Sequence, residues 1–168
     1  MRTTVVVGNP KPNSRTLDAA RRVATVLSGS DDVAEIDLAT LGHGLLQWDD
    51  DGVSRALDLT AASHLVIFAS PTYKGSYTGL LKLFLDQVVP DGLRGVLAVP
   101  VMLGAGPNHA MAPDLLLRPV LTELGSTTAF PGLHLSDKTY ATDGRIEDYG
   151  TLWAPTVTSM TLAARTGR

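Results

Sequence analysis

A polar segment near the N-terminus has the residue types that bind anions. Residues 8–16 read GNPKPNSRT and follow directly after the apolar run TTVVV. They lead into a predicted helix, and the first backbone N–H groups of a helix, together with its dipole, favour a phosphate group. Ser14 and Thr16 add hydroxyl donors, and Lys11 or Arg15 adds positive charge. The same residues fit a simpler role equally well, in which Ser14 only caps the helix.

Several familiar phosphate and nucleotide motifs do not match this sequence. A nucleotide-triphosphate loop requires a second glycine and a lysine where Asn13 and Ser14 stand. The G-x-G sequence at residues 104–106 lacks the third glycine of the dinucleotide fingerprint. No acceptor aspartate ends the apolar run LVIFAS, which disfavours response-regulator chemistry. The chain contains no cysteine, which excludes cysteine phosphatases, disulfides and Cys-ligated clusters.

Two further polar segments follow later apolar runs. Residues 71–76 read PTYKGS and place the ring of Tyr73 among small residues, and residues 104–110 read GAGPNHA. A flat heteroaromatic ligand needs such surroundings, with backbone polar groups at its edge and an apolar or aromatic wall at its face. Taken alone, residues 71–76 also fit a turn that begins at proline and leaves Tyr73 on the surface.

The spacing of apolar residues predicts five strands that alternate with helices. The strands expected are Thr3–Val7, Val33–Leu38, Leu65–Ser70, Gly95–Leu103 and Thr127–Phe130. The helices expected are Ser14–Leu27, Gly52–Ala62, Gly79–Val88, Asn108–Leu124 and Ile146–Arg165, with a loop over Leu41–Asp51. Pro119 removes a backbone donor within the fourth helix, so a kink or a broken hydrogen-bond ladder is expected there.

This alternation predicts an α/β fold with one domain over residues 1–168. The expected architecture is a flavodoxin-like, doubly wound sheet of five parallel strands in the order 2-1-3-4-5, with helices on both faces. Parallel strands end at the same edge of a sheet, so the segments after strands one, three and four should meet there. Their convergence indicates one ligand site.

Composition excludes several other classes of protein. The chain has 168 residues, of which 44% are hydrophobic and 18% charged, as in a globular domain with a real core. Its formal net charge of −3 offers no broad basic surface for nucleic acid. The N-terminus resembles neither a signal peptide nor a membrane span, so a cytoplasmic protein without membrane contact is expected. No metal site is predicted, because the four histidines lack ligand spacing and the Asp49–Asp51 run fits a solvated loop.

The three polar segments, read with the helices that follow them, resemble one enzyme family. The matching stretches are GNPKPNSRT, SPTYKGSYTGLLKLFLDQ and GAGPNHAMAPDLLLRPVLTELG. They resemble NADPH-dependent FMN reductases, especially the flavin reductases that serve two-component alkanesulfonate monooxygenases. The resemblance spans most of residues 3–125, and the stretch that begins at Pro71 is its most specific part.

The resemblance implies which residues bind the flavin. The FMN phosphate would be held by Ser14, Arg15 and Thr16, in the loop that contains Asn9. The isoalloxazine ring would be bordered by Pro71, Thr72, Tyr73, Lys74 and Gly75, and approached from the third segment by Gly104, Ala105 and Gly106. Two positions depart from the family pattern. Asn9 stands where serine is common, and Leu115 stands where the alkanesulfonate-linked relatives carry a tyrosine, so their interface behaviour need not transfer.

The reaction implied is hydride transfer from the nicotinamide of NADPH or NADH to N5 of FMN. No side chain is expected to act as a catalytic acid or base, because the flavin supplies the chemistry and the protein positions its ring. Tyr73, Lys74 and Gly75 are expected to shape the nicotinamide side. Two alternatives stay open: a reductase that passes electrons to a quinone, azo compound or metal ion, and a non-enzymatic flavodoxin-like electron carrier.

The resemblance also implies partners. The small molecules are a flavin and a nicotinamide dinucleotide, and a monooxygenase is a candidate recipient of the reduced flavin. The chain is expected to form a homodimer or a homotetramer. The apolar helix predicted over Gly79–Val88 offers a contact face for this assembly.

Overall fold

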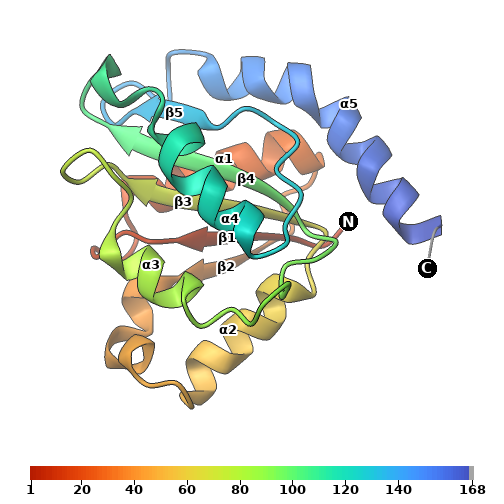
Figure 1. The fold of residues 1–168 in the computed structure, drawn as a ribbon. Helices are drawn as coiled ribbons and strands as arrows, with labels where there is room; N and C mark the ends of the chain where they lie inside the picture. The colour runs from red at the N-terminus through yellow and green to blue at the C-terminus, as the bar shows by residue number, and fades with distance from the viewer. Residues whose placement is uncertain (167–168) are drawn as a thin grey trace.

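The computed structural model describes residues 1–166 and has five parallel strands in one sheet, in the order β2-β1-β3-β4-β5 (Figure 1). The strands are β1 Thr3–Val7, β2 Val33–Asp37, β3 Leu65–Pro71, β4 Leu97–Gly104 and β5 Leu133–Ser136. The predicted α/β fold and strand order are confirmed. Because β1 pairs with both β2 and β3, the winding reverses at β1, and folds of this type bind ligands at such a point.

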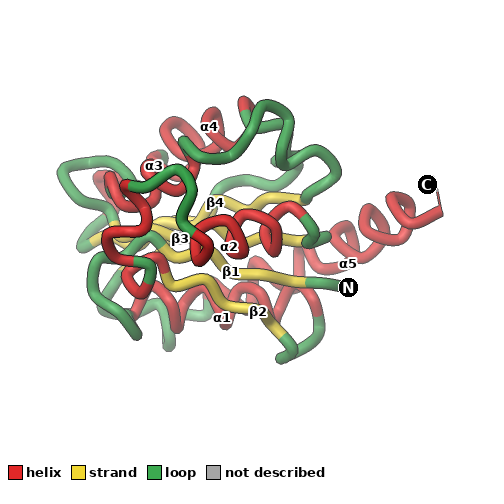
Figure 2. Tube along the Cα trace, turned by 90° about the horizontal axis from the view of Figure 1, so that it is seen from below, coloured by secondary structure: helices red, strands yellow, loops and turns green. Residues whose placement is uncertain are grey.

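Helices cover both faces of the sheet (Figures 1 and 2). One face is covered by α1 (Arg15–Ser28) and α5 (Arg145–Thr166), and the other by α2 (Asp51–Ala61), α3 (Gly79–Leu85) and α4 (Arg118–Glu123). Every residue of β1, β3 and β4 is buried. Burial on both faces explains why these strands are continuous apolar runs rather than alternating patterns. Within residues 1–166, no helix is long and apolar enough to cross a membrane.

Polar side chains fix where three of the helices begin. The side chain of Ser14 accepts a hydrogen bond from the N–H of Leu17 at the start of α1, and that of Thr78 accepts one from Leu81 at the start of α3. Asp50 accepts from two N–H groups at the start of α2, which gives one member of the Asp49–Asp51 run a structural role. Each such cap contributes about 1 kcal/mol of stability.

Two predicted segments differ in local structure. The region expected as a loop over Leu41–Asp51 contains a 3-10 helix at Gly42–Leu46, and another at Leu38–Thr40 begins where the last residue of the second strand was expected. The region expected as one helix is divided into a 3-10 turn at Pro107–His109, a π-helical stretch at Pro113–Leu117 and α4. Pro119 lies in the first turn of α4, where no N–H partner is required. The single continuous helix predicted over Asn108–Leu124 was therefore wrong, and the helix type changes next to Pro119, where a kink or a broken ladder was expected.

The fifth strand lies further along the chain than predicted. Thr127 forms only an isolated bridge with Leu97, and regular pairing resumes where Leu133 lies beside Val101. Four positions along β4 therefore correspond to six along its neighbour, so residues 128–132 leave the sheet as a bulge. The β-like sequence of residues 127–130 predicted the wrong strand.

Pro100 gives a reason for the bulge. Ala98 donates its N–H to the carbonyl of Thr127, and N–H groups two residues apart on a strand point to the same side. Position 100 would therefore donate toward β5, but proline has no N–H. A regular strand opposite Pro100 would contain an unpaired carbonyl, and the bulge avoids this.

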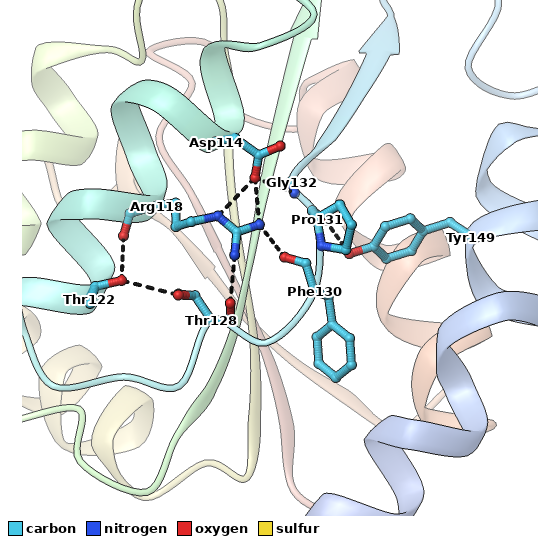
Figure 3. Close-up of polar contacts among 8 residues, drawn as sticks. All are labelled: Asp114, Arg118, Thr122, Thr128, Phe130, Pro131, Gly132 and Tyr149. Atoms are coloured by element: carbon cyan, nitrogen blue, oxygen red, sulfur yellow. Dashed lines mark hydrogen bonds and ion pairs between the residues drawn. The ribbon is translucent and has the colours of Figure 1, made fainter.

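A cluster of polar contacts around Arg118 holds the bulge in place (Figure 3). The guanidinium donates to the carbonyls of Thr128 and Phe130 and to Oδ1 of Asp114. The same Asp114 oxygen accepts the N–H of Gly132 at 2.7 Å. The Phe130 ring is buried against Trp153 of α5, with centroids 5.5 Å apart. The chain is thus attached to both α4 and α5 before it enters β5.

We expect Arg118→Leu to lower the free energy of unfolding by about 2–3 kcal/mol, because two backbone carbonyls would lose their donor and Asp114 its cation. Urea unfolding followed by circular dichroism measures this. The matched control is Arg94→Leu, whose partner Asp91 lies in an exposed ion pair, with side chains 77% and 61% accessible. That change should cost less than about 0.5 kcal/mol. Equal losses for the two variants would contradict a special role for Arg118.

Candidate functional site

The segments that follow β1, β3, β4 and β5 enclose one cavity of about 430 Å³. This volume lies within the range of about 300–1,000 Å³ that is common for small-molecule sites. The three polar segments predicted to converge all line the cavity, and the segment after β5 joins them. The lining residues are Asn9, Lys11, Asn13, Ser14, Arg15, Thr16, Pro71, Thr72, Tyr73, Leu103, Gly104, Ala105 and Asp137.

Most of the residues predicted to bind flavin lie in this wall. The nine that line it are Asn9, Ser14, Arg15, Thr16, Pro71, Thr72, Tyr73, Gly104 and Ala105. The other three predicted residues, Lys74, Gly75 and Gly106, belong to the same loops but do not line the cavity. The predicted set is therefore brought together at one place, although its outermost members face elsewhere.

Asn9 fixes the shape of the loop after β1. Its side-chain amide donates to Oγ1 of Thr16 at 2.9 Å, and its side-chain oxygen accepts the N–H of Lys11 at 2.9 Å. Asn9 and Thr16 are both buried, so the bond between them is shielded from water. Asparagine instead of serine at this position thus braces the loop from within.

Ser14 can cap α1 and bind a ligand at the same time. Its Oγ accepts the N–H of Leu17 at 3.3 Å, which uses one lone pair. The hydroxyl hydrogen is left to donate. The N–H groups of Leu17 and Asp18 already donate to the carbonyl of Ser14, so the donors that α1 can offer a ligand are those of its first two residues, Arg15 and Thr16. The two roles considered for Ser14 from the sequence are therefore compatible.

Charges of both signs surround the start of α1. Arg15 and Lys11 contribute positive charge to the cavity wall. Nη1 of Arg15 donates to the backbone carbonyl of Asp137 at 2.8 Å, and Nη2 lies 3.4 Å from Oδ2 of the same residue. The N–H of Asn13 donates to Oδ2 of Asp37 at 3.0 Å. The loop thus faces two carboxylates as well as its own cations.

The loop after β3 turns sharply at the rim of the cavity. Tyr73 and Ser76 exchange backbone hydrogen bonds of 2.9 and 3.1 Å, and the residues between them, Lys74 and Gly75, have φ angles of 52° and 83°. Positive φ at both central positions is the type I′ geometry that glycine favours. Lys74 and Gly75 form the tip of this turn, so a substitution of Gly75 would strain the backbone.

Thr78 holds the first two loops together. Its Oγ1 donates to the carbonyl of Gly8 while accepting the N–H of Leu81. A Cβ at Gly8 would lie 2.5 Å from Cβ of Leu81 and 3.1 Å from Oγ1 of Thr78. Only glycine permits this close approach of the first loop to the start of α3.

Three polar atoms at this edge are buried without a hydrogen-bond partner within residues 1–166: Thr72 Oγ1, His134 Nε2 and Asp137 Oδ1. A Cβ at Gly104 would lie 3.0 Å from Nε2 of His134 and 3.4 Å from Oγ1 of Thr72. Burial, followed by the charges of Arg145 and His109, lowers the pKa of His134 and disfavours its charged form. Unpaired polar atoms beside a cavity are expected where a ligand supplies the missing partners.

The described residues contain no group of three or more His, Asp or Glu side chains placed to hold a metal ion.

Asp137 is the one charged lining residue that lies outside every segment singled out from the sequence. It is the first residue after β5, a position at which side chains of parallel sheets commonly contact ligands. Because the fifth strand was predicted at residues 127–130, Asp137 did not stand out as a residue at a strand end. The apolar alternation of Leu133 and Leu135 was the available signal.

Comparisons with known proteins agree on one family. The family model described as NADPH-dependent FMN reductase matches residues 1–139, a range that includes every cavity-lining residue. An "FMN reductase (NADPH)" of Escherichia coli is 28% identical over 153 residues, which are 89% of this chain and 77% of that protein. An "NADH-dependent FMN reductase SfnF" of Pseudomonas putida is 34% identical over 102 residues, 60% of this chain and 55% of that protein. This chain thus spans only about half of some relatives.

Solved structures give the same result. The apo form of an NADH:FMN oxidoreductase, EmoB, superposes with a TM-score of 0.80 at 30% identity, over 96% of this chain and 89% of the other. An archaeal flavodoxin shares the fold, with a TM-score of 0.64 at 17% identity over 95% of this chain and 99% of the other. The resemblance inferred from the sequence is confirmed, and so is the prediction that the protein is an oxidoreductase. The chain belongs to the NADPH-dependent FMN reductase family.

Proposed function

We propose that residues 1–168 act as one domain that binds FMN in the cavity and reduces it with NADPH or NADH. The observation that carries the proposal is the cavity itself, which has an anion-binding helix start at one end and a glycine-lined, aromatic wall at the other. Members of an FMN reductase family are expected to have a cavity of this kind. The assignment of individual residues to parts of FMN follows from their chemistry.

The residues at the two ends fit the two ends of FMN. The hydroxyls of Ser14 and Thr16 and the first N–H groups of α1 suit the phosphate, and the charges of Lys11 and Arg15 add to them. At the other end, the absence of a side chain at Gly104 lets a flat ring approach the backbone. Thr72 offers an unpaired hydroxyl beside it.

Positioning is the contribution of the chain. When bound, FMN supplies the redox chemistry by accepting a hydride at N5 from the nicotinamide. The Asn9–Thr16 bond and the Thr78–Gly8 bond fix the spacing between the phosphate end and the ring end. Tyr73 lies at the rim with 52% of its surface exposed, where it can contact a second ligand.

Anaerobic mixing of the FMN-loaded protein with NADPH, and separately with NADH, tests the reaction. Rapid loss of the visible flavin absorbance is expected with at least one donor. Persistent absorbance with both would support an electron carrier without a nicotinamide site. If the flavin is reduced, profiling free flavin, quinones, azo dyes and ferric complexes as electron acceptors identifies the final acceptor.

The proposal extends to a partner enzyme. We propose that the reduced flavin leaves the cavity and is used by a monooxygenase, and that this occurs in the cytoplasm, where reduced nicotinamide dinucleotides are produced. Oxygenation by a supplied flavin-dependent monooxygenase, driven only by this chain and NAD(P)H, would test the transfer.

We expect FMN to bind more tightly than riboflavin, which lacks the phosphate. Arg15→Ala should weaken FMN binding by about 1–2 kcal/mol, the value of a charge-assisted hydrogen bond, and leave riboflavin binding unchanged. Quenching of flavin fluorescence measures both affinities. Arg22→Ala is the control, because Arg22 lies in the same helix, pairs with Asp18 and does not line the cavity. Equal dissociation constants for FMN and riboflavin in the native protein would contradict the phosphate site.

The rim should affect the nicotinamide more than the flavin. We expect Tyr73→Leu to keep FMN affinity within about tenfold, roughly 1.4 kcal/mol, and to slow flavin reduction further than that. Stopped-flow absorbance with NADPH measures the rate. Trp48→Leu is the control, since Trp48 is an aromatic residue that is 73% exposed and does not line the cavity. A native reduction rate in the Tyr73 variant would place the nicotinamide elsewhere.

We propose further that the chain assembles as a homodimer or a homotetramer through the face formed by α3 and α4. A groove of about 400 Å³ runs between these helices, with Leu85, Val120 and Leu124 among its lining residues. Exposed apolar side chains on α3 and in the segment just before α4 are Leu83, Met111, Leu115 and Leu116. A second copy would remove this apolar surface from water.

Light scattering at micromolar concentration should therefore give a mass of two or four times 17.7 kDa. Leu83→Glu together with Leu115→Glu should shift the protein toward monomer, because two charges would have to be desolvated at the contact. Leu59→Glu is the control, since Leu59 is 40% exposed on α2. A native monomer would refute the assembly, and an oligomer unaffected by the double change would place its contact on another face.

A further inference from the structure

Asp137 is held at the cavity wall by the backbone on both sides of it. Its N–H donates to the carbonyl of Gly104 at 3.0 Å, which extends the pairing of β4 and β5 by one residue. The carbonyl of Ser136, just before it, accepts the N–H of Tyr140 at 3.0 Å in the following turn. These bonds fix the backbone of Asp137 at the wall of the cavity.

The negative charge of Asp137 is only partly compensated. One carboxylate oxygen, Oδ2, lies 3.4 Å from Nη2 of Arg15, whose side chain is 64% exposed. The other, Oδ1, is buried and has no hydrogen-bond donor among residues 1–166. Because only one of its oxygens lies near a cation, the carboxylate exerts an electrostatic field in the cavity that it lines, and water screens this field in part because the side chain is 30% exposed.

The same contact occupies Arg15. Its guanidinium donates to the carbonyl of Asp137 at 2.8 Å, so it is directed toward the segment after β5. A ligand phosphate at the start of α1 would have to share this guanidinium with Asp137. The N–H of Asn13, another donor of the same loop, is already bonded to Asp37. An anion therefore meets competition from a carboxylate at each of these two donors.

From these contacts we propose that Asp137 is a specificity-determining residue that competes with the phosphate of FMN for Arg15 and so keeps the flavin exchangeable. The role rests on the proposed function, which places the phosphate at the start of α1. It makes FMN a substrate that enters and leaves rather than a permanently bound group. The affinity for FMN then depends on the salt concentration, whereas the affinity for riboflavin does not.

The expected size of the effect follows from the charges. A phosphate monoester carries between one and two negative charges near neutral pH. Repulsion from one carboxylate a few ångströms away, partly screened by water, is expected to weaken FMN binding about tenfold. Riboflavin has no phosphate and should not respond. A different role is also physically reasonable, in which Oδ1 accepts a hydrogen bond from a hydroxyl of the ribityl chain, and loss of the carboxylate would then weaken both flavins.

The test is Asp137→Asn in the full chain, with dissociation constants for FMN and riboflavin measured on flavin-free protein at low and high salt. We expect FMN to bind about tenfold more tightly at low salt, riboflavin to change less than about twofold, and the gain for FMN to shrink at high salt. Asp137→Ala should behave in the same way, and melting curves should show that both variants fold. Asp18→Asn is the control, because it removes a carboxylate from the first turn of α1 outside the cavity. Its effect on FMN should stay within about twofold.

A double-mutant cycle tests the contact with Arg15 directly. Arg15→Met should cost more FMN affinity in the Asp137→Asn background than in the native chain, because the guanidinium then no longer faces a competing carboxylate, although its bond to the backbone carbonyl of residue 137 remains. Unchanged or weaker FMN binding in Asp137→Asn, or an additive cycle, overturns the role of Asp137 while leaving the phosphate site intact. Equal affinities for FMN and riboflavin in the native chain overturn the phosphate site, and the role of Asp137 with it.

Discussion

The parallel hydrogen-bond ladder is the constraint from which the rest of this molecule follows. Because all five strands run in one direction, every segment that leaves a strand emerges at the same edge. Both faces of β1, β3 and β4 are buried beneath helices, so the sheet itself offers no surface for a ligand. Polar chemistry is therefore confined to the edge, where backbone groups are no longer used by the ladder. The cavity lies where strand pairing ends.

Local sequence was sufficient wherever local physics decides the structure. Unbroken apolar runs gave β1, β3 and β4 within one or two residues at most ends, because their environment is apolar on both sides. The loop at residues 8–16 could be recognised because a helix start exposes donors whatever surrounds it. The nine predicted residues that line the cavity lie in this loop and at or after the ends of β3 and β4, and their roles were implied by the family resemblance.

The rest depended on contacts between distant residues. The location of β5 is set by a proline on the neighbouring strand and by Arg118, which binds the carbonyls of Thr128 and Phe130. Neither effect is visible in the sequence around residue 127, which has good β propensity and forms a bridge at Thr127 alone. The error at β5 is also why Asp137 was missed. When the end of a strand at this edge is predicted wrongly, the site residue that follows it is not recognised.

Several polar groups in and around the cavity also make hydrogen bonds that stabilise the fold. Ser14 caps α1, Asn9 braces the first loop, and Thr78 joins that loop to α3. Each of these bonds stabilises the apo protein, so the donors presented to a ligand are already positioned and little side-chain entropy is lost on binding. This arrangement suits an enzyme whose cofactor carries the reactive atoms, because the demand on the protein is geometry rather than proton transfer.

The two ends of the cavity differ in rigidity, and this difference orders the events of a reaction. The end at α1 is braced by a buried hydrogen bond between Asn9 and Thr16 and by a partly buried one between Asn9 and Lys11. The rim is a two-residue turn whose Tyr73 is half exposed and whose contacts to the first loop run through the helix start at Thr78. A ligand anchored at the braced end keeps its position while a second ligand enters and leaves at the rim. Since the anchor is largely electrostatic, its strength can be adjusted by a charge such as Asp137 without any change to the rim. In the proposed function, affinity for the flavin and access for the nicotinamide are therefore assigned to different residues of one edge.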